Sequence, residues 1–258
     1  MKYLKTLAGA AALAVASFNV SAAPVTVGGV TWDTDHPIDF SADTDFFTQS
    51  VISSPGDLLS GWGRIGSING SNTFCQQCDL TFEFGGFSTT NVVLGEIRNF
   101  GANAVNSSTG SVIFVDFIFS GGYANIWVDN SANFDGSLAS VVDGNLWLSL
   151  APNLGLSSSL TASAWIAYDT LLNAPIFSEI VNGEGFAWLD VTGGPAAVYF
   201  DTNGMMFGAD LTVSSAFGTR ATPDNLTMNG NTIPEPASLA LLGLGLLGLV
   251  GGRRFKKA

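Results

Sequence analysis

The sequence predicts an all-β fold, an antiparallel β-sandwich that is jelly-roll-like or immunoglobulin-like. Short apolar stretches rich in β-branched and aromatic residues recur along the chain, and each is bounded by Gly, Pro, Asn or Asp. No long stretch between residues 24 and 232 keeps a helical period with caps at its ends. About ten short strands at this spacing are typical of a sandwich.

The strand pattern is clearest in the segment DLTFEFGGF, which begins at residue 79. Its apolar and polar side chains alternate with the period of two that turns one face of a strand toward a core. The segments 111–120 and 123–129 are separated by Gly121-Gly122 alone, so we expect a hairpin across these two glycines. Further strands are predicted at residues 145–150, 160–169, 185–191, 196–200 and 209–217.

Both ends of the chain have the composition of processing segments. Lys2 and Lys5 precede an apolar run, and the small residues Val20 and Ala22 follow it, which together predict a secretory signal peptide cleaved after Ala22. Near the other end, a polar segment without a clear pattern is predicted to be a linker. The chain then divides into a signal peptide (1–22), a β-sandwich domain (23–221), a linker (222–232) and a tail (233–258).

The exported part of the chain is strongly acidic. Residues 24–232 contain 20 acidic residues against three arginines and no lysine, so their net charge is −17. Such a surface cannot neutralise phosphates, which excludes a nucleic acid as a partner. It also repels anionic lipid and attracts cations.

The tail contains an apolar run that is short for a membrane span. Residues 237–252 carry no charge, and a transmembrane helix over them would have sixteen residues, whereas a span usually needs about twenty. Pro234 and Pro236 keep the chain before this run extended, which is the form that a protease requires. The positive-inside rule keeps the cations after the run on the cytoplasmic side; they are Arg253, Arg254, Lys256 and Lys257.

The tail, PEPASLALLGLGLLGLVGGRR, resembles the PEP-CTERM sorting signal of Gram-negative bacteria. The resemblance covers the motif Pro234-Glu235-Pro236, a short transmembrane helix and a basic end, in that order, together with a signal peptide. It implies an exosortase as the partner, with cleavage near the motif after a transient stay in the inner membrane. The protein would then be released from the cell or attached to its surface. A plain membrane anchor is the alternative.

Cys75 and Cys78 are the only cysteines of the chain. Two cysteines three positions apart in an exported protein predict a disulfide. A loop this short constrains the unfolded chain little, so we expect a local effect on the turn before the strand that starts at residue 79. The alternatives are a redox motif, which needs a βαβ setting, and a zinc site, which needs two more ligands.

Two acidic segments are candidates for a calcium site, because calcium prefers several oxygen ligands on a loop turned by Gly. The first segment surrounds His36 and contains five aspartates, and the second is DNSANFDG, with Asp129, Asn133 and Asp135. Neither has the terminal glutamate of an EF-hand loop. A solvated acidic loop is the alternative for each segment, and we expect no other cofactor.

The sequence favours a non-enzymatic cell-surface or extracellular-matrix protein with a structural or adhesive role, associated with biofilm and with extracellular polysaccharide as a possible partner. One alternative is a carbohydrate-binding module, which would show exposed Trp or Tyr in a groove; Trp62 is the candidate to check. The other is a polysaccharide hydrolase, which requires paired carboxylates, one with a raised pKa. A single histidine argues against most nucleophile–His–acid arrangements.

Overall fold

The computed structural model describes residues 23–37, 39–100, 108–153, 155, 158, 160–218 and 224–233. Within these ranges the chain forms twelve strands and two short helical turns, which confirms the all-β prediction. The strands are β1 (Val25–Val27), β2 (Val30–Trp32), β3 (Phe40–Gln49), β4 (Leu58–Ile68), β5 (Asp79–Asn99), β6 (Ser111–Ser120), β7 (Tyr123–Asp129), β8 (Asn145–Pro152), β9 (Leu160–Asp169), β10 (Ala174–Gly193), β11 (Leu211–Phe217) and β12 (Asn225–Gly230). The helical turns are α3 (Ala197–Phe200) and η2 (Met206–Gly208).

The ten strands β3 to β12 form one antiparallel sheet that closes on itself. Strand β3 pairs with β4, β4 with β5 and β11 with β12, and β12 returns to pair with β3. The remaining pairings complete the ring: β5 with β6 and β7, β6 with β9, β7 with β8, β10 with β8 and β9, and β10 with β11. The sheet is therefore a closed meander without the long crossings of a jelly roll.

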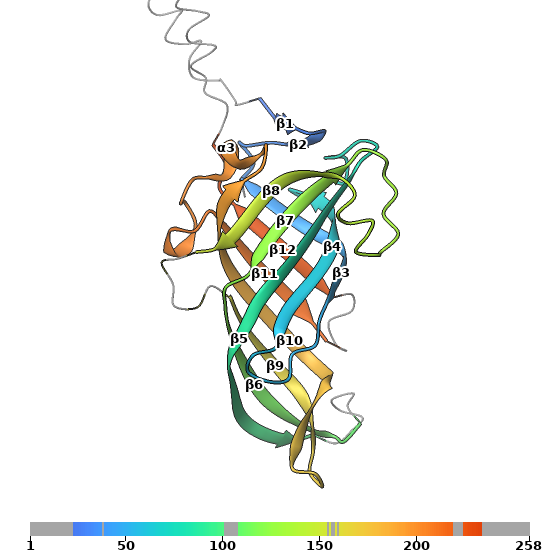
Figure 1. Ribbon diagram of the computed structural model, residues 1–258, viewed down its shortest axis with the longest axis vertical. Helices are drawn as coiled ribbons and strands as arrows, with labels where there is room; N and C mark the ends of the chain where they lie inside the picture. The colour runs from blue at the N-terminus through green and yellow to red at the C-terminus, as the bar shows by residue number, and fades with distance from the viewer. Residues whose placement is uncertain are drawn as a thin grey trace, which may run out of the picture.

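Figure 1 shows this closed sheet as two layers whose strands cross, with β5, β7 and β8 in front of β11 and β12. The two layers enclose one continuous hydrophobic core, to which every strand from β1 to β12 contributes. The predicted β-sandwich is thus confirmed, and its two layers are joined by backbone hydrogen bonds.

The predicted hairpin at Gly121-Gly122 is wrong, because β6 and β7 run end to end in the same direction. Both pair antiparallel with the same edge of β5. The glycines have φ values of 69° and 99°, and Gly86 of β5, with φ 71°, lies against them. Positive φ at two successive residues is also what a tight hairpin needs, but here it bends a continuing strand, as in a β-bulge. Strands β8 and β9 share one edge of β10 in the same way.

The predicted linker at residues 222–232 is wrong over Asn225–Gly230, which form β12. This strand lies between β11 and β3 and closes the sheet. Leu226 and Met228 are buried, and the polar residues between them are more exposed, so the segment has the period of two expected of a strand. The folded domain therefore extends to Ile233 rather than ending at residue 221.

The predicted strand at residues 196–200 is also wrong, because Ala197–Phe200 form the helical turn α3. Gly194 has φ 97° and Pro195 follows it, so the chain turns sharply after β10. Four residues after such a turn have no neighbouring strand to pair with, and Phe200 is buried in the core instead.

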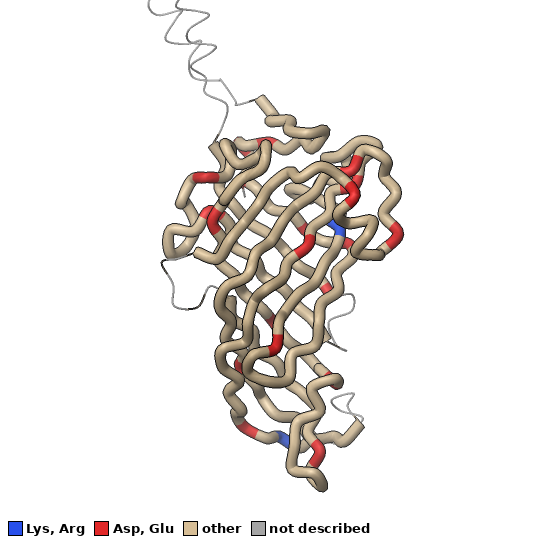
Figure 2. Tube along the Cα trace, viewed as in Figure 1, with Lys and Arg blue, Asp and Glu red and all other residues tan. Residues whose placement is uncertain are grey.

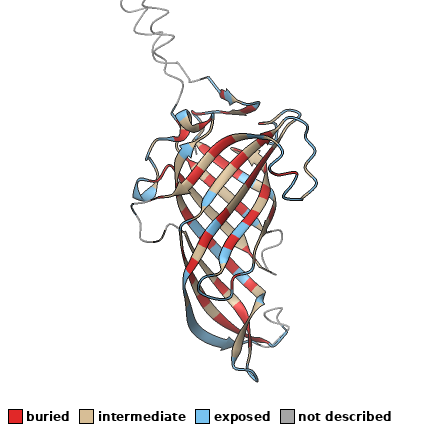
Figure 3. Cartoon of the chain, in the orientation of Figure 1, coloured by how far each residue is buried: buried red, intermediate tan, exposed pale blue. Residues whose placement is uncertain are grey.

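The two ends of the molecule differ in construction. At the capped end, the hairpin of β1 and β2 and the turn α3 lie across the mouth of the sheet (Figure 1). At the other end, four strands continue beyond the closed part as the extension, which consists of residues 90–99 of β5, 174–182 of β10, and the parts of β6 and β9 between them. Figure 3 shows mostly exposed positions along this part of β5.

Candidate functional site: the capped end and the sorting tail

The tail continues from Ile233, which is held by the folded domain. The backbone N–H of Ile233 donates to the carbonyl oxygen of Tyr199, at 2.8 Å. The N–H and the hydroxyl of Thr232 both donate to the carboxylate of Asp39. Asp39 itself has φ 59°, a conformation that Asp adopts more readily than most residues. The Pro-Glu-Pro motif therefore begins immediately after a residue that belongs to the domain.

The residues predicted to direct sorting lie outside the part of the chain that the structure describes. This applies to the signal peptide at 1–22, the apolar run at 237–252, Pro234, Glu235, Pro236, Arg253, Arg254, Lys256 and Lys257. Among the described residues, no helix has the length and hydrophobicity needed to cross a membrane.

An aromatic cluster seals the capped end. Trp32 of β2 is 3% exposed and contacts Trp147, Tyr199 and Phe200, with ring centroids 5.4–5.7 Å apart. Phe40 of β3 completes the cluster. Its five members come from four separate parts of the chain, so a buried Trp of the β1–β2 hairpin ties that hairpin to the sheet.

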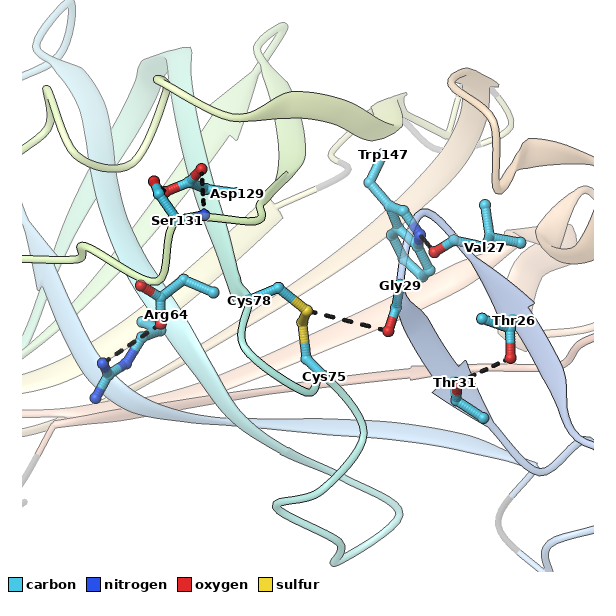
Figure 4. The surroundings of a disulfide bond; sticks show 11 residues. Thr26, Val27, Gly29, Thr31, Arg64, Cys75, Cys78, Asp129, Ser131 and Trp147 are labelled. Atoms are coloured by element: carbon cyan, nitrogen blue, oxygen red, sulfur yellow. Dashed lines mark hydrogen bonds and ion pairs between the residues drawn. A yellow bond between two sulfur atoms is a disulfide. The ribbon is translucent and has the colours of Figure 1, made fainter.

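The hairpin is also held by hydrogen bonds and by a disulfide, as Figure 4 shows. The indole N–H of Trp147 donates to the carbonyl oxygen of Val27, at 3.0 Å. Cys75 and Cys78 are joined by the predicted disulfide, with their Cα atoms 5.4 Å apart. The Cys78 sulfur lies 4.0 Å from the Gly29 carbonyl oxygen, so the disulfide stabilises the turn before β5 against the β1–β2 hairpin.

Of the proposed calcium ligands, Asp129 ends β7, and Asn133 and Asp135 lie on the loop between β7 and β8; each is engaged by neighbouring groups. The carboxylate of Asp129 accepts from the N–H and hydroxyl of Ser131. The amide of Asn133 donates to Asp143, at 3.2 Å. Hydrogen bonds from Ser137, and then from Ser140, lower the pKa of Asp135 to about 2. Within the described ranges, no three His, Cys, Asp or Glu side chains are grouped so that they could hold a metal ion.

The carboxylates of the acidic segment around His36 also accept hydrogen bonds, from nearby residues and from residues far along the chain. Asp33 accepts from the N–H of Asp35, and Asp43 accepts from the hydroxyl of Thr227. Asp45 forms two hydrogen bonds with Arg64, the shorter at 2.8 Å. Figure 2 shows acidic positions spread along the whole molecule rather than gathered in one place.

Two further carboxyl groups have shifted pKa values. Burial raises the pKa of Asp224, against the hydrogen bond from the Gly218 N–H. Hydrogen bonds from the N–H groups of Ser53 and Ser54, and from the Ser53 hydroxyl, lower the pKa of Asp57. Burial and hydrogen bonds with nearby residues account for both pKa shifts.

Two of the six tryptophans, Trp32 and Trp147, are buried, and the other four are partly exposed. Trp62 is half-buried, and its indole N–H donates to the carbonyl oxygen of Gly136, at 3.1 Å, which holds the β7–β8 loop against β4. Trp165 is covered by Arg98, whose guanidinium carbon lies 4.9 Å from the ring centroid. Trp188 contacts Phe207. The feature expected of a carbohydrate-binding module is a groove with exposed Trp or Tyr; Tyr123 of β7 is 44% exposed, and no tryptophan is exposed to that extent.

Two features were missed by reasoning from the sequence: the extension and the space within the core. The exposed leucines of the extension are visible in the sequence as Leu171-Leu172 followed by Asn173, a pair of apolar residues at a turn. The space in the core depends on which small residues become neighbours across strands, and that register is not readable from the sequence.

Comparison with known proteins identifies one segment. Residues 232–254 match the PEP-CTERM protein-sorting motif. No curated protein and no solved structure matches the chain. The motif marks a protein that is exported across the membrane and processed by an exosortase, which leaves it at the cell surface or secreted.

Proposed function

We propose that this protein is a non-catalytic surface or matrix protein with a structural or adhesive role, as in a biofilm. An exosortase delivers it, and its extension makes the adhesive contact. The observation that carries this proposal is a set of exposed apolar side chains on the extension, on β5 and at the β9–β10 turn, at the end opposite to the tail.

The arrangement of the two ends supports this role. The tail begins at Ile233, beside α3, whereas the turn between β9 and β10 lies at the far tip of the extension (Figure 1). A domain attached through residues next to its motif would hold the capped end toward the envelope. The extension would then point outward, where it meets other surfaces.

The chemistry of the extension favours an apolar partner over a polysaccharide. Leu171 and Leu172 are 95% and 76% exposed at its tip. On β5, Val93, Leu94 and Ile97 are about half exposed. Exposed apolar side chains mark an interaction site where they form one patch, which is what we propose for these residues. Contact with a protein or with a hydrocarbon surface removes apolar area from water. This stabilises the complex by about 25 cal/mol for each Å² of apolar surface buried.

The double substitution Leu171→Ser with Leu172→Ser tests this role. Both side chains are exposed, so the fold should tolerate the change. We expect the producing bacterium to export the variant in normal amount but to lose adhesion to an apolar surface and retention of the protein in its matrix. Immunoblots of the supernatant and the envelope measure export, and attachment to a hydrophobic plate measures adhesion.

The matched control is Val198→Ser, which removes an exposed apolar side chain (69%) from α3, at the other end. This variant should adhere like the native protein. If the double variant adheres normally while it is exported normally, or if the control loses adhesion equally, the extension has no adhesive role.

A further inference from the structure

A cavity of about 100 Å³ lies inside the closed sheet, surrounded by side chains from β3 to β12. It is separate from the capped end and from the sorting tail. Its walls are built largely from aromatic and aliphatic side chains, among them Phe82 and Phe84 of β5 and Phe117 of β6.

The cavity exists partly because a row of small residues crosses three adjacent strands. Gly185 of β10 is paired directly with Ala162 of β9 on one side and with Ser215 of β11 on the other. All three residues line the cavity. Three neighbouring inward positions thus carry at most two side-chain heavy atoms each, and Gly185 carries none, which leaves the volume of a large side chain unfilled.

Glycines on the opposite part of the sheet keep the centre open as well. A Cβ at Gly61 of β4 would lie 2.5 Å from the ring of Phe84, and one at Gly63 would lie 2.6 Å from the ring of Phe82. The two rings therefore lie flat over backbone that has no side chain. If β4 carried larger residues here, these rings would have to turn into the cavity.

The lining selects a neutral, apolar ligand. Among the described residues that form it, none is charged, and the polar side chains are those of Gln49, Ser50 and Ser215. The Ser50 hydroxyl is already engaged, since it donates to the Leu58 carbonyl oxygen and accepts from the Ser60 N–H. A charged group would lose its hydration inside such a space without a compensating partner.

The size and the place of the cavity limit the ligand further. An engineered apolar cavity of about 150 Å³ stays dry and holds benzene, so this space accepts about four carbon atoms. Gln49 and Ser50 stand where β3 ends, at the level where the closed part of the sheet gives way to the extension. A longer molecule can leave the cavity past them.

We propose that this cavity binds the end of a saturated alkyl chain that belongs to a neutral molecule. The chain end lies between the row Ala162, Gly185 and Ser215 and the phenyl rings of β5 and β6. The remainder of the molecule leaves past Gln49 and Ser50. This site is independent of the adhesive role of the extension.

Titration of the exported, processed protein with 1-octanol tests the site by calorimetry. We expect saturable binding of one molecule per chain and a rise in the midpoint of thermal unfolding with octanol concentration. Octanoate, which has the same chain length and a charged head, should bind at least tenfold more weakly. Absence of saturable octanol binding, or equal binding of octanoate, overturns the proposal.

The variant Ala162→Leu locates the binding. The added side chain fills the space, so octanol should bind at least tenfold more weakly while the fold is kept. Ala124→Leu, which enters the same cavity from β7, should give the same result and guards against a variant that fails to fold. Thr161→Leu adds a similar bulk on the opposite face of β9 and should leave binding unchanged. If the two cavity variants bind octanol as the control does, the site lies elsewhere and the proposal is wrong.

Discussion

The capped end and the extension contain comparable strands but bury them very differently. At the capped end, Trp32 and Phe200 are 3% and 0% exposed, and a disulfide and backbone hydrogen bonds hold the hairpin over them. At the extension, Leu171 is 95% exposed, and the outer edge of β5 has no neighbour among the described strands. The end next to the sorting tail is therefore densely packed, whereas the far end leaves large apolar side chains in water.

The largest expected effect is a difference in how much a side chain at each end contributes to the free energy of unfolding. Trp32→Ala removes a buried ring from the aromatic cluster and should lower the free energy of unfolding by about 3–5 kcal/mol. Leu171→Ala removes a side chain that is already in water and should change it by less than about 0.5 kcal/mol. Urea unfolding of the processed protein measures both. Equal losses would show that the two ends do not differ as described.

The next effect concerns Gly122, at the bend between β6 and β7. Gly122→Ala places a Cβ 2.5 Å from the ring of Phe87 at a residue with φ 99°. Gly56, with φ 93°, has nothing within 4 Å of its Cβ position and is a matched control for the backbone strain alone. We expect Gly122→Ala to cost about 1–3 kcal/mol more than Gly56→Ala, because the core at Phe87 would be overpacked. The midpoints of thermal unfolding of the two variants measure this difference. Equal decreases in midpoint would refute tight packing of Phe87 against Gly122.

Removal of the disulfide should affect the capped end and leave the extension unchanged. The double substitution Cys75→Ser with Cys78→Ser should cost at most about 2 kcal/mol, because the closed loop is short. Amide hydrogen exchange should become faster at Phe74 to Asp79 and in the β1–β2 hairpin. Exchange in the extension should stay the same, and an increase there would mean that the disulfide acts on the whole sheet.

The smallest effect depends on pH and lies in the β7–β8 loop. The pKa of Asp135 is lowered to about 2, from an ordinary value of 3.8, so its ionised form stabilises the folded loop. This contribution is fully present above about pH 4 and is lost as the pH falls through 2. Protection of the Ser137 N–H, which donates to Asp135, measured against the exchange rate of an unfolded peptide at the same pH, should therefore fall between pH 4 and 2. Asp135→Asn should remove this pH dependence, and an unchanged profile in that variant would contradict the assignment.

Local patterns made the class of the fold predictable. The alternation in the segment that starts at residue 79 predicted a strand, which is confirmed as β5. The spacing of Cys75 and Cys78 predicted the disulfide that joins them. Local patterns could not decide how strands pair. Two glycines with positive φ suit a hairpin or a kink equally, and only the presence of β5 beside both β6 and β7 selects the kink.

Strand β12 shows why polar segments are misjudged. Its core-facing residues Leu226 and Met228 are separated by a single polar residue, and Asn and Gly surround them, so the segment resembled a linker. Its place is fixed by partners far away in the chain, such as Asp43, whose carboxylate accepts from the hydroxyl of Thr227. The same holds for Asp39, which the sequence placed in an acidic loop and which in the structure holds Thr232 beside the tail.

The most direct test of the account is the intact mass of the protein recovered from the culture supernatant and from the envelope of the producing bacterium. We predict a chain that begins after the signal peptide and ends near Pro234-Glu235-Pro236, immediately beyond the residues that the domain holds. Recovery of the untrimmed chain, from Met1 to Ala258 and embedded in the inner membrane, would contradict it.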